Sequence, residues 1–428
     1  MSRPGVAWGV QGALAVVEQG MYSLVSFAFT ILLARWLRPP EFGAFSLAFS
    51  AFLIGSGYYN ALLLEPAMVL GPSVYGDDLH GYLQHLPALH WRLTLPLSCI
   101  AGAPLVALTV LQPQRPLPRA LLAAVLCLPL MLRIWLARRV AYIVREPRRA
   151  VVANILYAAL VVLGLCGLRV SGHLSAVTAF LAIALASAVS AIPTLRKLGL
   201  NRPPPSGGPS SREILRAHWR YGHWIVWATL AGAISLHGPD YFAGAVVGLG
   251  AAGALSAMEV AALPVVQALT ALGFLALPSL AMEFRNGNIT AIRRKVRLLS
   301  AVLAPLAGLY AAVILLLHRP LEHLVFGGKY APSASLLAVM AVYPIFMALA
   351  LAPSLFLRAV QHPQHYLLTN VMIAPVGILA SLLLTLRFGL AGAAWSIVII
   401  YMASWFVASF LATRWRHSHG RQHSELPA

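Results

Sequence analysis

Charged residues are scarce in this chain. Only 10% of its 428 residues are Asp, Glu, Lys or Arg, and just 12 of them are acidic. A soluble globular domain carries about a quarter charged residues, so a chain with so few could not cover a surface that faces water. Because 60% of the residues are apolar and the mean hydropathy is +0.78, the sequence predicts a protein of the lipid bilayer.

Several sequence features of enzymes and metalloproteins are also missing. The chain has no G-x-x-x-x-G-K-[ST] loop, which excludes ATP hydrolysis by that route. It has three cysteines, and all lie in apolar runs, where we expect small buried thiols rather than a disulfide or a metal site. They are Cys99, Cys127 and Cys166. We expect no cofactor and no metal.

Two further motifs resemble ligand sites, but helix packing and a solvated surface explain them better. The stretch Gly248–Gly253 matches G-x-G-x-x-G, but it lies in an apolar run and lacks an acidic residue about 20 positions on, so close helix packing explains it better than a nucleotide site. His80, His85 and His90 are spaced by five in a segment that we expect to be a cytoplasmic loop. We interpret them as a solvated or interfacial face.

Long apolar runs dominate what is present. A spanning helix needs about 20 mostly apolar residues, and this length predicts twelve spans and thus an all-α integral membrane protein. The eighth run is too long for one straight crossing and contains Pro264 and Pro278, which predict a kink, a tilt or an extension. The spans are 10–34, 43–64, 93–112, 117–137, 150–169, 174–195, 219–238, 245–282, 298–317, 333–357, 366–386 and 389–412.

The basic residues predict the orientation. With both termini in the cytoplasm, the inside segments hold 23 of the 31 lysines and arginines and the outside segments hold 8. This bias follows the positive-inside rule. The net charge of +19 is therefore a topology signal, and we expect no nucleic acid partner. The first apolar run is too long for a signal-peptide core, so we expect a retained first helix.

Composition divides the twelve spans into two sets of six. A stretch rich in Pro, Gly, Ser and Arg at 196–218 predicts a flexible cytoplasmic linker between an N-terminal lobe, 1–195, and a C-terminal lobe, 219–412. A basic cytoplasmic tail follows at 413–428. Gly43–Ser46 (GAFS) is echoed half a chain later by Gly253–Ser256 (GALS), and more loosely by 388–396. The echo favours an internal duplication, although Gly, Ala and Ser are also common helix-packing residues in membranes.

Ionisable and amide side chains within or near apolar spans are the candidate functional residues. Glu18 and Glu259 would face a cavity between the halves and bind a proton or Na⁺, which predicts coupling to a gradient of either ion. Arg133, near the cytoplasmic end of span four, and Arg358 would donate to a phosphate, or would extend to the lipid headgroups as topology anchors. The other candidates for the substrate or ion pathway are Asn60, Glu65, His237, Asp240 and Asn370. We expect Glu65, before Pro66, to end span two.

Three stretches carry a family resemblance. LLARWLRPPEFGAFSLAFS (32–50), LEHLVFGGKYAPSASLLAVM (321–340) and LRFGLAGAAWSIVI (386–399) resemble the polysaccharide-transporter branch of the multidrug/oligosaccharidyl-lipid/polysaccharide exporter superfamily. That branch includes the O-antigen and exopolysaccharide flippases. The resemblance implies two six-helix lobes around a cavity that opens alternately to each side of a bacterial cytoplasmic membrane. It also implies a lipid-linked oligosaccharide, held by its diphosphate and turned from the inner to the outer leaflet.

The sequence thus predicts a flippase, with membrane lipid, a lipid-diphosphate-linked glycan and polysaccharide assembly proteins as its partners. The alternative is a multidrug or small-solute exporter of the same superfamily. A membrane-embedded glycan ligase or polymerase is a third class. Its members commonly carry a large outer loop with catalytic residues, and the outer loops expected here are short. We therefore expect a transporter rather than an enzyme.

Overall fold

The computed structural model describes residues 20–21, 23–200, 210–285, 288–359 and 363–420. In these ranges the chain forms helices and no strand. It divides into two compact units, Met1–Thr229 and Leu230–Ala428. The division falls within helix α8 (Ser211–Phe242), downstream of the predicted linker at 196–218, of which 201–209 lie outside the described residues.

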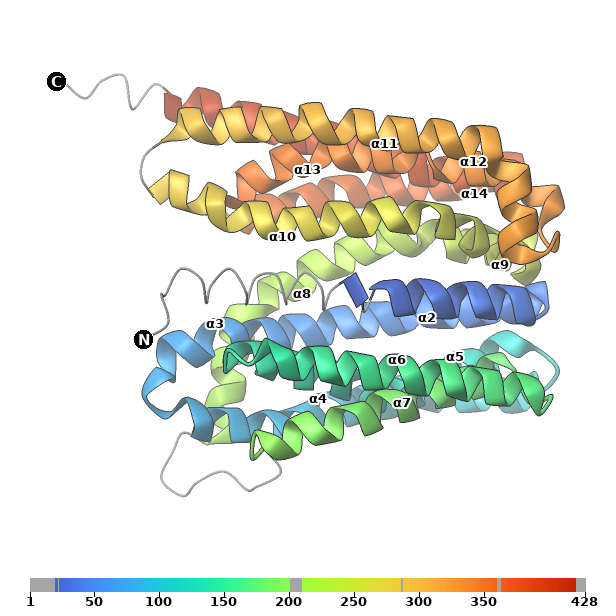
Figure 1. The fold of residues 1–428 in the computed structure, drawn as a ribbon, viewed down its shortest axis with the longest axis horizontal. Helices are drawn as coiled ribbons and strands as arrows, with labels where there is room; N and C mark the ends of the chain where they lie inside the picture. The colour runs from blue at the N-terminus through green and yellow to red at the C-terminus, as the bar shows by residue number, and fades with distance from the viewer. Residues whose placement is uncertain (1–19, 22, 201–209, 286–287, 360–362, 421–428) are drawn as a thin grey trace. The chain divides into compact units, whose positions relative to one another are not determined.

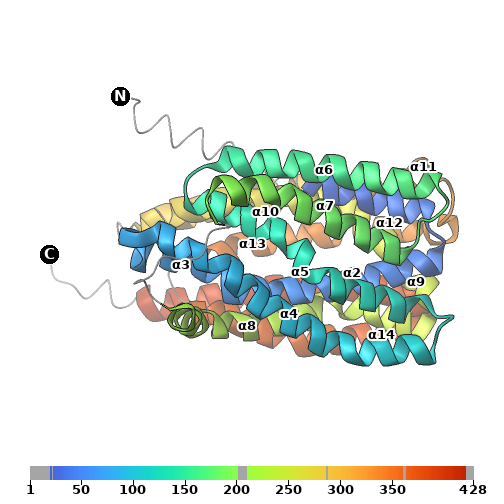
Figure 2. The ribbon, with the colours of Figure 1, turned by 90° about the horizontal axis from the view of Figure 1, so that it is seen from below.

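The first unit is a bundle of long helices (Figure 1). After the apolar helix Ser23–Trp36 its elements are α2 (Pro39–Tyr59), η1 (Asn60–Leu64), α3 (Glu65–Val74), η2 (Gly76–Asp78), α4 (Leu79–Leu111), α5 (Pro116–Ile143), α6 (Pro147–Val170) and α7 (Ala176–Lys197). Helix α5 packs against α2, α4, α6 and α7. Figure 2 shows α4 running beside α5, with α3 at one end of α4.

An aromatic face aligns α2 with its neighbours. Phe42, Phe45, Phe49 and Phe52 are spaced by three or four residues and so share one side of the helix. The Phe45 ring centroid lies 4.8 Å from that of Phe180 in α7, and the Phe52 centroid lies 6.2 Å from that of Trp135 in α5. Offset and edge-on ring pairs of this kind stabilise a packed interface beyond simple burial.

The second unit begins with the last part of α8. Its further elements are η3 (Ala243–Val247), α9 (Leu249–Glu259), η4 (Val260–Ala262), α10 (Leu263–Arg285), α11 (Ile289–Phe326), η5 (Ala331–Ser333), α12 (Ser335–Met340), α13 (Tyr343–Ala359) and α14 (Pro363–Gly420). Helix α13 packs against α10, α11 and α14, as Figure 1 also shows. Leu280, Ile292, Phe356 and Leu411 form one of its buried clusters.

The helices agree with the predicted twelve-span layout. Nine helical segments of the described chain are long and apolar enough to cross a membrane. One of them, in α14, is broken at Gly389 (φ 59°, ψ −135°) and so supplies two spans. The shorter helix Ser23–Trp36 and the more polar α8 supply the other two. The protein is therefore an all-α, multi-pass membrane protein.

Glycine makes two of the chain reversals possible. Gly389 in α14 and Gly248 before α9 both have positive φ, the latter at 125°. Residues that carry a Cβ rarely adopt such backbone angles, whereas glycine adopts them readily. Gly248 is the first residue of the G-x-G-x-x-G match, so its place in the fold is that of a turn before a helix.

Several predicted boundaries were wrong because helices continue past the apolar runs. Helix α4 begins at Leu79 and not near 93, and α11 ends at Phe326 and not near 317. His80, His85 and His90 therefore lie in a helix rather than a loop, and His85 and His90 are buried. His85, His90 and Glu322 of these extensions are buried, which a count of apolar residues does not detect.

The prediction for the cysteines was correct only in part. Cys127 is buried and Cys166 is half-buried, but Cys99 is exposed. Cys99 lies on a side of α4 that also exposes Leu95 and Ile100. In a membrane protein such an apolar side faces lipid, so an apolar run alone does not identify a position inside the bundle.

Candidate functional site

The first unit contains a helix interruption at Pro66. Proline has no N–H, so the carbonyl of Leu62, four residues earlier, receives no hydrogen bond from it. The helix opens into the π-type turn η1, in which the Glu65 N–H bonds to the carbonyl of Asn60. The prediction that Glu65 ends this span was wrong, because the chain continues as α3 after the interruption. Turns of this kind recur at functional sites.

A side chain from α8 satisfies the carbonyl that proline leaves open. His218 Nδ1 lies 3.1 Å from the Leu62 carbonyl oxygen, and His218 Nε2 lies 2.7 Å from the Tyr82 hydroxyl. A neutral imidazole that donates through Nδ1 accepts from the hydroxyl at Nε2. Gly222, one turn further along α8, lies so close to the carbonyl of Ala61 that no Cβ would fit. These contacts fix the first part of α8 against η1 and α4.

Arg133 lies deeper in its helix than the sequence suggested. The predicted span ended at 137, but α5 continues to Ile143. The Arg133 guanidinium carbon lies 5.5 Å from the ring centroid of Trp91, a cation–π contact. It also interacts electrostatically with Tyr59, whose hydroxyl lies 2.8 Å from His90 Nδ1. Among the described residues, no acidic side chain pairs with Arg133.

A second arginine joins Asn60 and Glu65. Arg139 donates to the Asn60 side-chain oxygen at 3.3 Å, and the Asn60 amide donates to the Glu65 carboxylate at 3.5 Å. Asn60 and Glu65 were candidates from the sequence, but Arg139 was not, because the basic residues of its segment were interpreted as a topology signal. The polar interior around η1 therefore includes two guanidinium groups.

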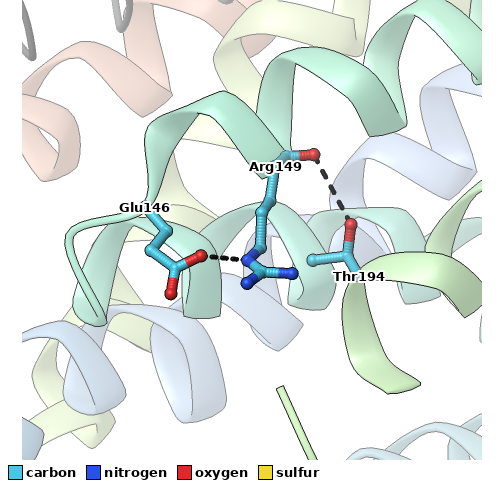
Figure 3. Close-up of polar contacts among 3 residues, drawn as sticks. All are labelled: Glu146, Arg149 and Thr194. Carbon is cyan, nitrogen blue, oxygen red and sulfur yellow. Dashed lines mark hydrogen bonds and ion pairs between the residues drawn. The ribbon is translucent and has the colours of Figure 1, made fainter. Parts of the chain in front are cut away.

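Another basic residue of this unit, Arg149, has an acidic partner. Figure 3 shows the ion pair between Arg149 and Glu146 at the start of α6. The Thr194 hydroxyl of α7 donates to the Arg149 carbonyl oxygen at 3.5 Å. These contacts join the beginning of α6 to the end of α7. Arg149 is thus neutralised by an acid, whereas Arg133 has an aromatic ring beside it.

The second unit brings two carboxylates together. Asp240 is buried near the end of α8, and Glu259, half-buried, is the last residue of α9. The two groups are close enough to interact electrostatically. Ser256 donates to Asp240 Oδ1 at 3.5 Å. Glu18, which was predicted to face the same cavity as Glu259, lies outside the described residues.

Tyrosines surround this carboxylate pair. The rings of Tyr343 and Tyr401 stack with centroids 4.7 Å apart, and both hydroxyls interact electrostatically with Glu259. The Tyr310 hydroxyl donates to the Ala261 carbonyl oxygen at 2.5 Å, within the 3₁₀ turn η4 that follows Glu259. These tyrosines were not predicted from the sequence, because nine of the 14 tyrosines fall within the predicted spans and nothing in the pattern distinguishes these three.

Small residues allow α8 and the first part of α14 to approach closely. A Cβ on Gly232 would lie 3.0 Å from the side-chain oxygen of Asn370, and one on Gly377 would lie 2.9 Å from the Cα of Ser235. Ser381 and Thr385 of α14 are fully buried, and neither hydroxyl has a hydrogen-bond partner within the described part of the chain. Asn370 therefore lies at a helix contact, beside a polar stripe.

The remaining candidates are not joined to these clusters. His237 lies half-buried in α8, and no hydrogen bond connects it to Asp240 in the described structure. The Arg358 side chain lies outside the described part of α13. Among the described residues, no group of His, Cys, Asp and Glu is arranged to hold a metal ion.

Comparison with known proteins identifies the fold. No family model and no curated protein matches the chain. It is similar to the inward-facing conformation of a multidrug resistance MATE family transporter of the MOP superfamily, with 14% identity, a TM-score of 0.73, and coverage of 94% of this chain and 96% of the other. The outward-facing conformation of such a transporter gives 15% identity and a TM-score of 0.67, with 96% of each chain covered.

A third similar structure is a MOP superfamily transporter from Pyrococcus furiosus, whose binding pocket is described as having reverse polarity. It shares 16% identity at a TM-score of 0.67, with 96% of each chain covered. Identities this low establish shared architecture and not shared substrate. The chain has the fold of the MATE transporters of the MOP superfamily.

Proposed function

We propose that this protein is an alternating-access membrane exporter, driven by a cation gradient, that moves amphipathic small solutes of the multidrug type. Both an inward-facing and an outward-facing transporter structure share its fold over nearly the whole chain. This likeness supports the multidrug alternative of the sequence analysis better than the glycan flippase.

The observation that carries the proposal is the Asp240–Glu259 pair. Two carboxylates close together in an apolar environment repel each other when both are ionised. A proton or Na⁺ bound between them removes that repulsion and neutralises part of the charge. Three hydroxyl groups lie on these helices: that of Ser256 on α9, and those of Ser381 and Thr385 on α14, which packs against α9. Hydroxyl oxygens can coordinate a hydrated or partly dehydrated cation.

Their position suggests how ion binding is coupled to movement. Glu259 ends α9, and the 3₁₀ turn η4 separates α9 from α10, whose second residue is Pro264. Helix bends concentrate at such interruptions. A change of charge at Glu259 therefore acts on the point where the two helices can change their mutual angle. Binding of the cation would favour one angle and its release the other, which is the requirement for gradient-driven alternating access.

The test is transport in proteoliposomes with an imposed pH or Na⁺ gradient and a fluorescent cationic dye as the solute. Glu259→Gln and Asp240→Asn should each lower gradient-driven transport by at least about tenfold, because an amide cannot exchange a proton or balance a cation. The matched control is Glu283→Gln, which removes an acid whose partner is Lys295, 2.7 Å away at a more exposed position. Full transport by both site variants would refute the coupling role.

A second candidate is the flipping of a lipid-linked oligosaccharide across a bacterial cytoplasmic membrane. Arg133 favours it, because a guanidinium with an aromatic ring beside it and no acidic partner among the described residues suits a diphosphate. The three junction stretches of the polysaccharide branch support it as well. Polysaccharide assembly proteins would then be partners of the transporter.

The two candidates differ in their substrate and in the unit that binds it. Proteoliposomes that carry a fluorescent lipid-diphosphate oligosaccharide report its translocation directly. Glycan translocation that Arg133→Gln abolishes, together with no transport of the dye, would favour the flippase. Arg149→Gln is the control, because Arg149 already pairs with Glu146. In the host, deletion of the gene should then leave full-length glycan on the cytoplasmic leaflet.

A further inference from the structure

A groove in the second unit lies between α11, α13 and α14. Its volume is about 340 Å³, and its lining combines one cation and several hydroxyls with apolar and aromatic side chains. The residues that matter for its chemistry are Arg297, Ser300, Phe356, Trp405, Ser409 and Thr413. None of the acids and tyrosines near Asp240 and Glu259 lines it, so it is a separate feature of this unit.

The groove is graded from a basic mouth to an apolar interior. Ile292, Phe356 and Leu411 share one buried cluster, so the starts of α11 and the ends of α13 and α14 lie at one level. Trp405, Ser409 and Thr413 are spaced by four residues on one face of α14 and lead toward that level. Arg297 and Thr413 are exposed there, whereas Phe356 is buried.

The charge of the mouth is positive and uncompensated. Lys295 pairs with Glu283 at 2.7 Å, but Arg294 and Arg297 have no acidic partner among the described residues. Both line an adjoining open cavity of about 550 Å³ with Thr290. The hydroxyls of Ser300 and Ser409 form no hydrogen bond within the described structure and are therefore available as donors. Arginine and hydroxyl donors together suit a phosphate group.

The surface beyond the mouth identifies the rest of the ligand. Leu298, Val302, Leu306 and Leu309 follow Arg297 along α11 at spacings of four, four and three, so they form one stripe. All four are exposed, by 48% to 65%. A stripe this apolar lies against hydrocarbon, so a ligand with its phosphate at Arg297 would have its chain beside these residues. A free phosphate ion would make no use of the stripe.

We propose that this groove binds a phospholipid of the cytoplasmic leaflet through its anionic headgroup, with the phosphate at Arg297 and the first part of the lipid against Trp405 and Phe356. The positive-inside prediction places this end of α11 in the cytoplasm. Anionic lipids give the cytoplasmic leaflet its negative surface, and basic pockets between helices on that side hold their headgroups. Charge complementarity thus selects an anionic lipid over a zwitterionic one.

The experiment measures bound lipid on the full-length protein. Purified protein is exchanged into detergent with equal amounts of phosphatidylglycerol and phosphatidylcholine, and the retained lipid is counted by native mass spectrometry. Wild-type protein should retain phosphatidylglycerol preferentially. Arg297→Gln should reduce that retention about fivefold, the factor that corresponds to about 1 kcal/mol per basic residue near an anionic surface. Ser409→Ala should reduce it by a smaller factor.

The matched control is Arg196→Gln, which removes an exposed arginine at the end of α7 in the first unit and should leave retention unchanged. Equal retention by the wild type and Arg297→Gln would overturn the proposal, as would equal binding of the two lipids. Displacement of phosphatidylglycerol by inorganic phosphate at comparable concentration would show an anion site without lipid specificity and would overturn it too. The readout is binding alone, so loss of transport does not affect it.

Discussion

The two proline interruptions resemble each other but gather different side chains. In each, a side chain from another helix bonds to a nearby carbonyl, but Leu62 lies four residues before Pro66 whereas Ala261 lies three residues before Pro264. His218 bonds to the Leu62 carbonyl, and Tyr310 donates to the Ala261 carbonyl. Arg133 and Arg139 lie near the first interruption, which also contains Glu65, whereas the carboxylates Asp240 and Glu259 lie near the second. A proline interruption therefore does not determine chemistry, which depends on the side chains that other helices bring to it.

The geometry of the two interruptions differs as well. The first is a π-type turn that the chain stabilises through both side-chain and backbone contacts with α8, whereas the second is a single 3₁₀ turn. We infer that the first interruption is a rigid part of its unit and that the second is the more adaptable one. The following predictions test this difference, from the largest expected effect to the smallest.

The largest effect is expected at Gly222. Any Cβ there would collide with the Ala61 carbonyl, a backbone atom that cannot rotate away, so Gly222→Ala should lower the free energy of unfolding by about 3 kcal/mol. Gly167→Ala is the matched control. Gly167 also lies in a helix but has no atom near its Cβ position, so this change should stabilise by up to about 1 kcal/mol. Thermal unfolding in detergent measures both, and equal melting temperatures would contradict the close contact.

The next effect concerns the histidine at the first interruption. His218→Phe keeps an aromatic ring but removes both nitrogen atoms and therefore both hydrogen bonds. The Leu62 carbonyl and the Tyr82 hydroxyl then lose these partners. We expect a loss of about 2 kcal/mol in the free energy of unfolding. Tyr82→Phe removes only one of the two bonds and should cost about half as much. An equal loss in His218→Phe and Tyr82→Phe would show that the bond to Leu62 contributes nothing to stability.

The corresponding substitution at the second interruption should cost less stability. Tyr310→Phe removes one donor to the Ala261 carbonyl, and we expect a loss of about 1 kcal/mol. If η4 is the adaptable interruption, this variant should also alter transport by the exporter more than His218→Phe does, although it loses less stability. Transport rates per folded molecule decide the point. A larger transport defect in His218→Phe would assign the adaptable role to η1.

Apolar runs and prolines were sufficient to predict the helices. They predicted twelve helices, because burial in lipid demands long apolar segments, and a kink, tilt or extension of the eighth run with Pro264 and Pro278, because proline removes a helix hydrogen bond. The interruption lies just before Pro264, whereas α10 continues through Pro278. The same signals did not predict where α4, α5 and α11 begin or end. Those helices extend beyond the apolar runs, and their extensions pack on other helices. A polar residue such as His90 is buried there because the Tyr59 hydroxyl forms a hydrogen bond with it.

The site was harder to predict than the helices. Single candidates such as Asp240, Glu259 and Arg133 followed from their rarity in apolar spans. Their neighbours did not, because Asp240 meets Glu259 only through the reversal at Gly248, and Arg133 meets Trp91 through the packing of α4 on α5. Contacts between helices depend on their relative rotation, and a shift of one residue turns a side chain by about 100°.

The smallest loss in the free energy of unfolding is expected at the helix caps, where one cap comes from another helix and one is local. Glu41, in the first turn of α2, accepts a hydrogen bond of 2.9 Å from the Ala176 N–H at the start of α7, so it caps a helix other than its own. In the second unit, Asn288 caps α11 locally, accepting from the Ala291 N–H at 3.0 Å.

A carboxylate at a helix N-terminus contributes about 0.3–1 kcal/mol. Glu41→Gln keeps an acceptor oxygen but loses the charge, so it should cost less than 1 kcal/mol, and Glu41→Ala should cost about 1 kcal/mol. Asn288→Ala should cost a similar amount. Unlike the local cap, Glu41 also joins α2 to α7, so combining Glu41→Ala with Phe180→Leu in that interface should deviate from additivity. Additive losses in the free energy of unfolding would show that the remote cap acts on α7 alone.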